Sequence, residues 1–332
     1  MKILVTGAAG YIGSHTCRLL IESGHQVVGY DNLSRGHHMA FERAAAGSLF
    51  VEGDLLDTSL LGQIMRDEAI QAVFHFAAFG LVGESVEHPQ LYYHNNVEGS
   101  VSLLKAMQQA GISRLVVSST TAIYGEPETM PISEEMHPAP INPYGQSKWD
   151  VECLLQEARD RDGLGFAALR YFNAAGAAAD GMLGEDHDPE THLIPIVLQV
   201  ALGQREKIQI FGNDYPTPDG TCVRDYVHVC DLAAAHLKAL NLLEPGTGIQ
   251  INLGSGVGTS VLEIVEHARR VTGHEIPAEF AARRSGDPPL LVANNSQANS
   301  ILGWTPEYSG LNSILTSAWQ WHRRHPQGYK TS

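Results

Sequence analysis

Three glycines near the start of the chain, at positions 7, 10 and 13, constrain its fold more than any other feature. They follow "KILVT" (2–6), a continuous aliphatic run typical of buried parallel strands, and precede a helical stretch (11–24) that ends on glycine. A strand, a glycine turn and a helix in this order direct backbone N–H groups and a positive helix end toward a pyrophosphate. A tight turn without a ligand is the alternative, but this spacing favours dinucleotide binding.

The same alternation of apolar runs and helical stretches continues through the first half of the chain. Further strands are expected at 25–31, 72–78, 114–119 and 166–172. Helical stretches lie between them, and the one at 95–111 also ends on glycine. Strand–helix alternation of this kind predicts an α/β fold with a doubly wound parallel sheet.

The composition and periodicity of the sequence change after residue 172. Residues 173–192 are rich in glycine, alanine and acids without a clear period, which predicts a long functional loop. Beyond the loop, helices are expected at 193–203 and 259–272, and a strand that leads into a helix is expected at 219–240. We therefore expect a nucleotide-binding domain over 1–172 and a smaller substrate domain over 173–332, some segments of which can cross back to the sheet.

Charge and cysteine content bear on partners and location. The formal net charge of −15 disfavours nucleic acid and anionic membranes as partners. The four cysteines show no C-x-x-C spacing, so we expect free thiols in a reducing cytoplasm. Gly7 interrupts the first apolar run, and no apolar stretch approaches the ~20 residues of a membrane helix. The expectation is a cytoplasmic protein without a signal peptide.

Two acidic residues follow expected strands on the nucleotide side. Asp31 lies eighteen residues after Gly13, where a carboxylate accepts hydrogen bonds from ribose hydroxyls and repels a 2′-phosphate. This position favours NAD over NADP, although an Asp-Asn pair is also a common turn. Asp54 follows the third expected strand, where it either reaches the adenine amino group or is an ordinary loop residue.

Tyr144 and Lys148 lie one turn apart on a predicted amphipathic helix that starts after Pro143. A phenol with a pKa near 10 is a poor base at neutral pH, but a nearby ammonium and a positive nicotinamide ring favour the phenolate. Hydroxyl residues at 118–120 end a strand at its carboxyl side, where they can hydrogen-bond a reacting oxygen. Together these groups predict proton transfer coupled to oxidation of an alcohol.

At this point the chain resembles the extended short-chain dehydrogenase/reductase family over nearly its whole length, most closely the branch of UDP-sugar 4-epimerases. The resemblance rests on "VTGAAGYIGSHT", "DNLSRG", "HFAA", "SSTTAIYGE", "NPYGQSK", "RYFNAAGA", "GEDHDPETHLIP", "IFGNDYPTPDGTCVRDYVHV" and "RRSGDPP". It implies a Rossmann-type domain with bound NAD and a smaller C-terminal domain that binds a UDP-sugar. The implied activity interconverts UDP-glucose and UDP-galactose, in galactose metabolism, by transient NAD-dependent oxidation at the hexose C4 atom.

The resemblance also implies roles for individual residues. Tyr144 would be the base, Lys148 would lower its pKa and hold the nicotinamide ribose, and Thr120 would hydrogen-bond O4. The implied cofactor residues are Gly7, Gly10, Tyr11, Ile12, Gly13, Asp31, Asn32, Asp54, Leu55, Phe76, Ala77, Asn95, Ser118, Tyr144, Lys148 and Tyr171. The implied substrate residues are Thr120, Asn173, Leu193, Phe211, Arg224, Arg284 and Asp287.

Two of these residues have simpler interpretations. Arg224 can form a surface ion pair with Asp225, and Phe211 can belong to the core.

Three positions depart from the pattern of that branch. Gly80 stands where many relatives carry a lysine that contacts the cofactor phosphates, which predicts weaker retention of NAD. His192 stands where a sugar-contacting asparagine is common, so its role is open. Leu291 stands where some relatives carry a tyrosine near the sugar C2 atom. The smaller leucine leads to the hypothesis that UDP-N-acetylglucosamine and UDP-N-acetylgalactosamine are also substrates.

His187 and His192 lie among acidic residues, a composition that can bind a metal. Hydride chemistry with an organic cofactor needs no metal, so we expect a solvated polar loop and no metal site.

Other functions and assemblies stay open at this stage. A sugar-nucleotide 4,6-dehydratase needs an additional acid–base pair, which Thr121 and Ala122 do not provide. A non-catalytic NAD-sensing regulator would not need the Tyr144–Lys148 pair. Helices at 92–110 and 144–161 can pair with a second subunit as a four-helix bundle, which the resemblance suggests, although the sequence alone also allows a monomer.

Overall fold

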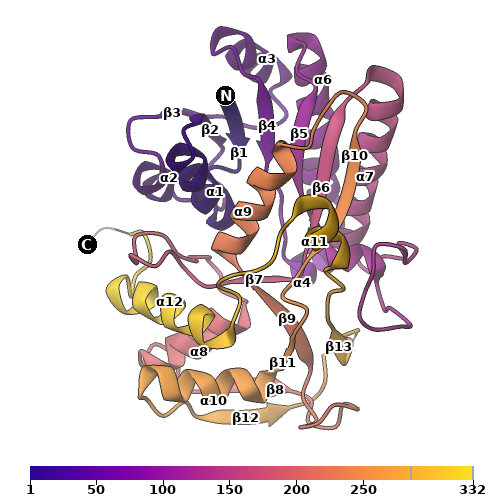
Figure 1. The fold of residues 1–332 in the computed structure, drawn as a ribbon. Coiled ribbons are helices and arrows are strands. Elements are labelled where there is room, and N and C mark those ends of the chain that lie inside the picture. Colours follow the sequence, from indigo (N-terminus) through magenta and orange to yellow (C-terminus); the bar gives the residue numbers. More distant parts are fainter. Residues whose placement is uncertain (285, 331–332) are drawn as a thin grey trace.

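The computed structural model describes residues 1–284 and 286–330 and is built around a seven-stranded parallel sheet (Figure 1). The strand order is β10-β6-β5-β4-β1-β2-β3. The strands are β1 (Lys2–Thr6), β2 (Gln26–Asp31), β3 (Leu49–Glu52), β4 (Ala72–His75), β5 (Arg114–Thr120), β6 (Gly165–Tyr171) and β10 (Gly248–Leu253). This confirms the expected doubly wound α/β fold. From β1 the chain adds strands toward one edge of the sheet as far as β3, and from β4 it adds them toward the other edge. Ligands bind where the strand order reverses in this way in open α/β sheets.

Helices cover both faces of the sheet, which is why its strands read as continuous aliphatic runs. In β1, Ile3 and Val5 face one core while Leu4 faces the other. The first face is covered by α1 (Tyr11–Glu22), α2 (His38–Ala44), α9 (Val229–Leu240) and α11 (Ser296–Leu302). The second face is covered by α3 (Thr58–Asp67), α6 (Gly99–Ala110) and α7 (Pro143–Asp162).

The helices that carry candidate residues begin and end as their local sequence predicts, with one exception. Helix α7 starts at Pro143, where the Asn142 side chain accepts a hydrogen bond of 2.8 Å from Gly145 N, and it ends before the left-handed Gly163. The stretch expected as one helix at 95–111 is divided into a π-helix η1 (Tyr93–Glu98) and α6. The short elements α4 (Val82–Glu87), α5 (Pro89–Tyr92) and η2 (Thr121–Tyr124) complete this region.

The second part of the chain forms a smaller unit below the carboxyl ends of the strands (Figure 1). Its strands are β7 (Asn173–Ala175), β8 (Ile208–Phe211), β9 (Val223–His228), β11 (Gly258–Ser260), β12 (Ala278–Ala281) and β13 (Leu290–Leu291). Its helices α8 (Leu193–Ala201), α10 (Val261–Thr272) and α12 (Leu311–Arg324) share one core. The expected loop at 173–192 is irregular apart from β7. Within residues 1–284 and 286–330, no helix has both the length and the apolar character required to traverse a bilayer.

Two segments of the second part return to the large sheet. Strand β10 pairs with β6 in parallel, and helix α9 packs against α1. The substrate side and the nucleotide side are therefore joined through the sheet itself.

Candidate active site

The glycine turn combines close packing with an open helix end. Gly7 has a φ of +71°, and a Cβ atom there would lie 2.5 Å from Ala77 N. A Cβ on Gly13 would lie 2.0 Å from the carbonyl oxygen of Gly7, so the helix can approach the turn only without a side chain. Gly10 is the N-cap of α1 and has no side-chain cap, and its Cβ would meet only Gly7 O, at 3.3 Å. The space before the helix N-terminus therefore fits a pyrophosphate.

Asp31 and Asp54 lie at the same edge of the sheet as this turn. The Asp31 carboxylate is buried and accepts hydrogen bonds from Ala9 N (3.0 Å) and Leu33 N (2.8 Å). Burial raises the pKa of Asp31, and these two hydrogen bonds oppose the shift. Asn32 Nδ2 donates to Asp54 Oδ2 at 2.9 Å, which links the ends of β2 and β3. Asp31 therefore closes the turn at residues 31–33, which was the alternative to a ribose contact, and it also binds the glycine turn through Ala9 N.

The other predicted cofactor residues come from neighbouring elements at the carboxyl edge. Phe76 and Ala77 follow β4, Asn95 lies on η1, Ser118 lies near the end of β5, and Tyr171 ends β6. Tyr11 and Ile12 begin α1, and Leu55 packs against Gly99.

Sequence reasoning missed His236 on α9, which contacts two of these residues. Its Nε2 atom is hydrogen-bonded to the Tyr171 hydroxyl, and its ring lies 4.8 Å from that of Phe76. Burial lowers the pKa of His236 to about 4, so the ring is neutral.

Tyr144 and Lys148 are placed on α7 beside the end of β5. The ammonium of Lys148 donates to the Ser118 carbonyl (2.9 Å) and hydroxyl (3.2 Å). Burial lowers the pKa of Lys148 to about 8, and the charge of Glu152 opposes the shift. Burial raises the pKa of Tyr144, and a hydrogen bond with the Thr120 side chain lowers it. Without a cofactor, the protein therefore holds the phenol protonated at neutral pH.

A buried network behind Lys148 was not expected from the sequence. Glu152 accepts hydrogen bonds from Arg170 Nε (3.0 Å), Arg170 Nη2 (2.6 Å) and Ser119 Oγ (2.5 Å). Arg170 Nη1 also donates to the Tyr124 hydroxyl (2.7 Å), which donates to Asn252 Oδ1 (2.9 Å). The available signal was the carboxylate of Glu152 on the apolar face of the helix, where an unpaired charge is costly.

Asn96 is a second residue that the sequence did not reveal. It is buried, accepts from Phe79 N (2.8 Å), and donates to Phe79 O and Ser147 Oγ (both 3.1 Å). These bonds tie the loop after β4 to α7. They also fix Gly80, where a Cβ atom would lie 4.0 Å from the Tyr144 hydroxyl oxygen. The loop position that lacks a lysine therefore faces the candidate base.

Four of the predicted substrate residues in the second part contact one another in two pairs. Arg224 on β9 is hydrogen-bonded to Asp287, and the guanidinium of Arg284 lies 4.0 Å from the centre of the Phe211 ring. The alternative ion pair between Arg224 and Asp225 is wrong, because the buried Asp225 accepts instead from main-chain and serine donors. Phe211 is half-buried beneath the guanidinium rather than part of the core.

A pocket of about 650 Å³ adjoins these contacts. It is lined by Glu126, Pro127, Met130, Tyr215, Pro216, Arg283, Arg284, Gly286, Asp287, Pro288, Pro289 and Leu290. The remaining predicted substrate residues lie on neighbouring elements: Asn173 is exposed on β7, and Leu193 begins α8. Leu291 pairs with Arg224 in the β13–β9 register.

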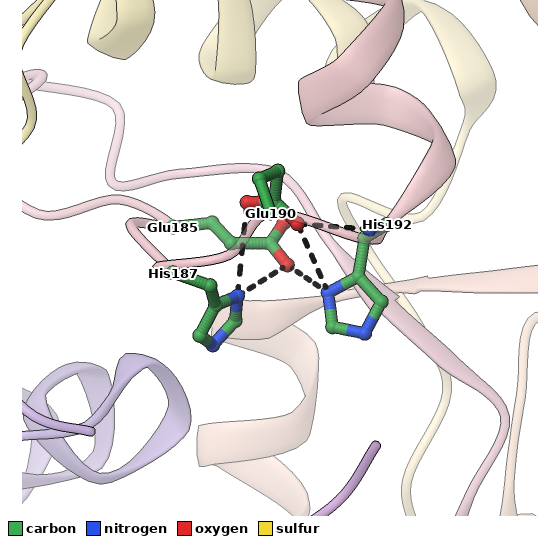
Figure 2. Close-up of side chains that lie close together, drawn as sticks. All are labelled: Glu185, His187, Glu190 and His192. Atoms are coloured by element: carbon green, nitrogen blue, oxygen red, sulfur yellow. Dashed lines mark hydrogen bonds and ion pairs between the residues drawn. The ribbon is translucent and has the colours of Figure 1, made fainter. Parts of the chain in front are cut away.

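The segment before α8 is only in part the solvated loop that we expected, because Glu185 is buried whereas residues 188, 189, 191 and 192 are exposed. Glu185 is only 3% exposed, His187 and Glu190 are half-buried, and the side chain of His192 is 50% exposed. Figure 2 shows these residues and His192 with their polar atoms turned toward one another. The four side chains thus form a partly buried His–Glu cluster beside the candidate site.

The sequence and the structure were compared with known proteins. A profile of the NAD dependent epimerase/dehydratase family matches residues 3–254. A UDP-glucose 4-epimerase of Halalkalibacterium halodurans is 52% identical over 332 residues, which cover 100% of this chain and 98% of that protein. One of Streptococcus mutans is also 52% identical over 332 residues, with 99% of each chain covered.

Solved structures agree with this result. A crystal structure of a UDP-glucose 4-epimerase superposes with a TM-score of 0.95 at 49% identity and full coverage of both chains. The enzyme of Bifidobacterium longum, solved in complex with NAD+ and UDP, superposes with a TM-score of 0.94 at 37% identity, covering 99% of this chain and 100% of that one. The chain therefore belongs to the NAD dependent epimerase/dehydratase family and, within it, to the NAD-dependent isomerases known as UDP-glucose 4-epimerases.

Proposed function

We propose that the chain interconverts UDP-glucose and UDP-galactose by transient oxidation at C4, with Tyr144 as the base, Lys148 as its cationic neighbour and Thr120 as the hydrogen-bond partner of O4. The observation that carries the proposal is the position of these three side chains at the end of β5, where Lys148 is hydrogen-bonded to Ser118 and Tyr144 to Thr120. The relationship to UDP-glucose 4-epimerases at about 50% identity supports the substrate.

The residues of the turn fit NAD. The open N-terminus of α1 suits the pyrophosphate, and the Asp31 carboxylate retains lone pairs for the adenosine ribose after its two main-chain hydrogen bonds. The Brucella ovis relative, 48% identical with a TM-score of 0.92 over 96% of this chain and 97% of that one, was solved in complex with NAD. When bound, NAD supplies reversible two-electron oxidation at the hexose C4 atom.

The proton chemistry falls to Tyr144. Its hydroxyl oxygen takes the O4 proton as C4 is oxidised and returns it on the other face of the sugar, while Thr120 holds O4. Burial raises the pKa of the phenol, so a positive charge is needed to make it a base. Lys148, with a pKa of about 8, is about nine-tenths protonated at pH 7 and supplies part of that charge. The rest of the charge would come from the oxidised cofactor when it is bound.

Inversion at C4 requires a firm hold on the nucleotide and a loose hold on the hexose. The substrate residues support this division, because the charged and aromatic contacts of Arg224, Arg284 and Phe211 lie together in the second part of the chain. Arginine matches a diphosphate by paired hydrogen bonds, and an aromatic ring can stack on a base. Asn173 and Leu193 would then face the sugar. In this proposal residues 1–172 bind NAD and 173–332 bind the UDP-sugar.

Tolerance of N-acetylated sugars is proposed from Leu291. A leucine leaves more room than a tyrosine near C2, and a UDP-Glc/GlcNAc 4-epimerase of Campylobacter jejuni is 40% identical, with a TM-score of 0.85 over 97% of this chain and 99% of that one. We expect Leu291→Tyr to reduce kcat/KM for UDP-N-acetylgalactosamine by at least 10-fold and to leave that for UDP-galactose within about 3-fold, since one clash costs ~1–3 kcal/mol. Equal losses on both substrates would contradict this.

A cytoplasmic homodimer completes the proposal. Helices α6 and α7 would form its interface, and Val101 on α6 is 46% exposed, as an unpartnered apolar face would be. The four cysteines form no disulfide, which supports a reducing compartment.

The decisive experiment incubates the purified protein with UDP-galactose and no added cofactor and measures UDP-glucose. We expect turnover, and we expect Tyr144→Phe to lower kcat by ~10²–10⁴-fold, the range for loss of a general base. Tyr308→Phe is the matched control, because this tyrosine is exposed. Unchanged turnover in the Tyr144 variant would overturn the mechanism. A 4-keto-6-deoxy sugar product would instead indicate a dehydratase, and bound NAD without turnover a regulator.

A further inference from the structure

The His–Glu cluster of Glu185, His187, Glu190 and His192 has the donor atoms of a metal site. It lies between β7 and α8, outside the groups used for the proposed chemistry. Each residue offers one ligand atom, and these four atoms all lie within 4.8 Å of one another. Figure 2 shows two imidazole nitrogens and two carboxylates that converge on one point.

The distances between these donor groups are close to those around a tetrahedral ion, and the two histidines face different oxygens of Glu190. Zinc bonds of about 2.0–2.2 Å to nitrogen and oxygen place neighbouring ligand atoms roughly 3.3–3.5 Å apart. His187 Nδ1 lies 3.4 Å from Glu185 Oε1 and 3.8 Å from Glu190 Oε2, and His192 Nδ1 lies 3.8 Å from Glu190 Oε1. Only the contact of 2.5 Å between His192 Nδ1 and Glu185 Oε1 is too short, and it would open on binding.

A second observation points into the same space. The Nδ1 atom of His187 is buried and makes no hydrogen bond of normal geometry within the part of the chain that the structure describes, its contact with Glu185 Oε1 being 3.4 Å long. Buried ring nitrogens are normally paired, because an unpaired one has lost its hydration without compensation. Glu185, which faces this nitrogen, is itself almost completely buried. A metal ion would satisfy both groups.

We propose that Glu185, His187, Glu190 and His192 bind one divalent transition metal ion, for which Zn²⁺ is the best match. Two neutral imidazoles and two carboxylates neutralise a divalent charge, and this N/O donor set suits zinc and its neighbours rather than calcium or magnesium. Four protein ligands leave no open position, so the role is structural. Our expectation of no metal considered only the redox step and did not address such a role.

The position of the cluster indicates what the ion would stabilise. His192 is the N-cap residue of α8, and the His187 ring lies 6.4 Å from the Tyr11 ring in an edge-to-face arrangement. Tyr11 begins α1 at the glycine turn and donates from its hydroxyl to Gly176 O at 2.6 Å. A metal ion would therefore fasten the loop between β7 and α8 to both the nucleotide turn and the first helix of the substrate side.

A metal-free alternative exists, in which protonated histidines pair with the carboxylates. Burial would lower the pKa of His187, yet the adjacent carboxylates of Glu185 and Glu190 raise it to about 10. The two states differ in what they predict for added metal. The protonated network excludes the ion, whereas the proposed site takes up one equivalent for each chain.

The test is titration of the tag-free, chelator-treated protein, with its NAD retained, with CoCl₂ and then ZnCl₂. We expect one Co²⁺ per chain with the intense visible absorption of tetrahedral cobalt, displaced by Zn²⁺. We also expect Zn²⁺ at about 100 times its Kd to raise Tm by about 4 °C. These readouts need no substrate, so they are independent of the proposed activity.

His187→Gln is the variant of choice, because among the described residues its Nδ1 atom makes no hydrogen bond of normal geometry and only a 3.4 Å ion pair with Glu185 would be lost. We expect it to weaken metal binding by more than ~100-fold, since even outer partners of a ligand contribute 10–100-fold. His94→Gln is the matched control, because His94 also faces a carboxylate, Glu98 at 2.7 Å, but on the surface. The proposal is overturned if the wild type takes up no metal, or if both variants bind it as the wild type does.

Discussion

Replacing Glu152 with glutamine tests whether the buried network behind Lys148 supports both the fold and the chemistry. The Glu152 and Arg170 side chains are only 1% and 4% exposed, and they are joined by two hydrogen bonds. Glutamine keeps the shape of Glu152 but removes its charge. The guanidinium of Arg170 is then left in the interior without a counter-charge.

The expected loss of stability follows from that burial. Removing one partner of a buried ion pair costs about 3–5 kcal/mol. For a chain of 332 residues, an unfolding entropy of roughly 2.1 cal/mol/K per residue converts this loss into a decrease in Tm of about 4–7 °C. Glu152→Gln combined with Arg170→Met should recover part of the loss, because a hydrophobic side chain leaves no unpaired charge.

The same substitution should shift the pH dependence of activity. Burial lowers the pKa of Lys148 to about 8, and the charge of Glu152 works against that decrease. Without Glu152 the pKa of Lys148 falls further, so the ammonium is lost at a lower pH. If this ammonium helps Tyr144 to act as a base, the alkaline limb of the kcat profile moves to lower pH.

Thermal unfolding and a kcat profile from pH 6 to 9 measure the two effects. Glu157→Gln provides the matched control, since Glu157 is exposed on the same helix and its loss should change stability by no more than ~0.5 kcal/mol. If the two variants have the same Tm and the same profile, the network has no special role. A decrease in Tm with an unchanged profile would separate the fold from the chemistry and refute the link to Lys148.

Further predictions concern the turn, the hydroxyl beside the base and the buried histidines. Gly13→Ala places a Cβ atom 2.0 Å from a carbonyl oxygen, so purified protein should lose bound NAD, measured after acid release, whereas Gly83→Ala meets nothing within 4 Å and should keep it. Thr120→Val removes the hydrogen bond that lowers the pKa of Tyr144, so kcat should fall ~10-fold or more with little change in KM. Burial lowers the pKa of four histidines to about 3–4, so the unfolded state binds more protons below pH 6.5. As the pH falls from 6.5 to about 4, each of these histidines should lower the free energy of unfolding by ~1.4 kcal/mol per pH unit. Replacement of one of them by glutamine should make the free energy of unfolding, measured by urea titration at several pH values, depend less steeply on pH. These histidines are His15, His75, His228 and His236.

The large sheet was mostly predictable because its strands carry their own signal. A parallel strand covered on both faces must be aliphatic throughout, so β1, β5 and β6 could be recognised without knowing their neighbours. The pairing of β10 with β6 was different. Residues 248–253 are joined to a strand some eighty residues earlier, and no local pattern specifies that partner. The π-helix η1 was also invisible, because its residues read as an ordinary helix.

The candidate site divides in the same way. Tyr144 and Lys148 could be paired from the sequence because a helix brings residues four apart onto one face. Asn96 could not be found by such a rule, since its partners Phe79 and Ser147 lie on two other segments. The His–Glu cluster shows the limit most clearly. Its four members were visible within eight residues, but the burial that distinguishes a site from a solvated loop is imposed by elements far away in the sequence.

The protonation state of Tyr144 connects the fold to the proposed reaction. Burial raises the pKa of the phenol, and Lys148, whose own pKa is lowered to about 8, would offer one positive charge in compensation under the proposed mechanism. A site that kept the phenol ionised at all times would hold a buried charge whether or not it was needed, and such a charge is costly. In the proposed mechanism, Tyr144 would be a phenolate beside the oxidised cofactor and a phenol beside the reduced one, since only the oxidised nicotinamide ring is positively charged. Under this proposal, proton transfer would be tied to the redox state of the cofactor, and the proton would stay on Tyr144 for as long as the sugar is oxidised. Such coupling would allow a site that holds the hexose loosely to return the proton and complete each cycle.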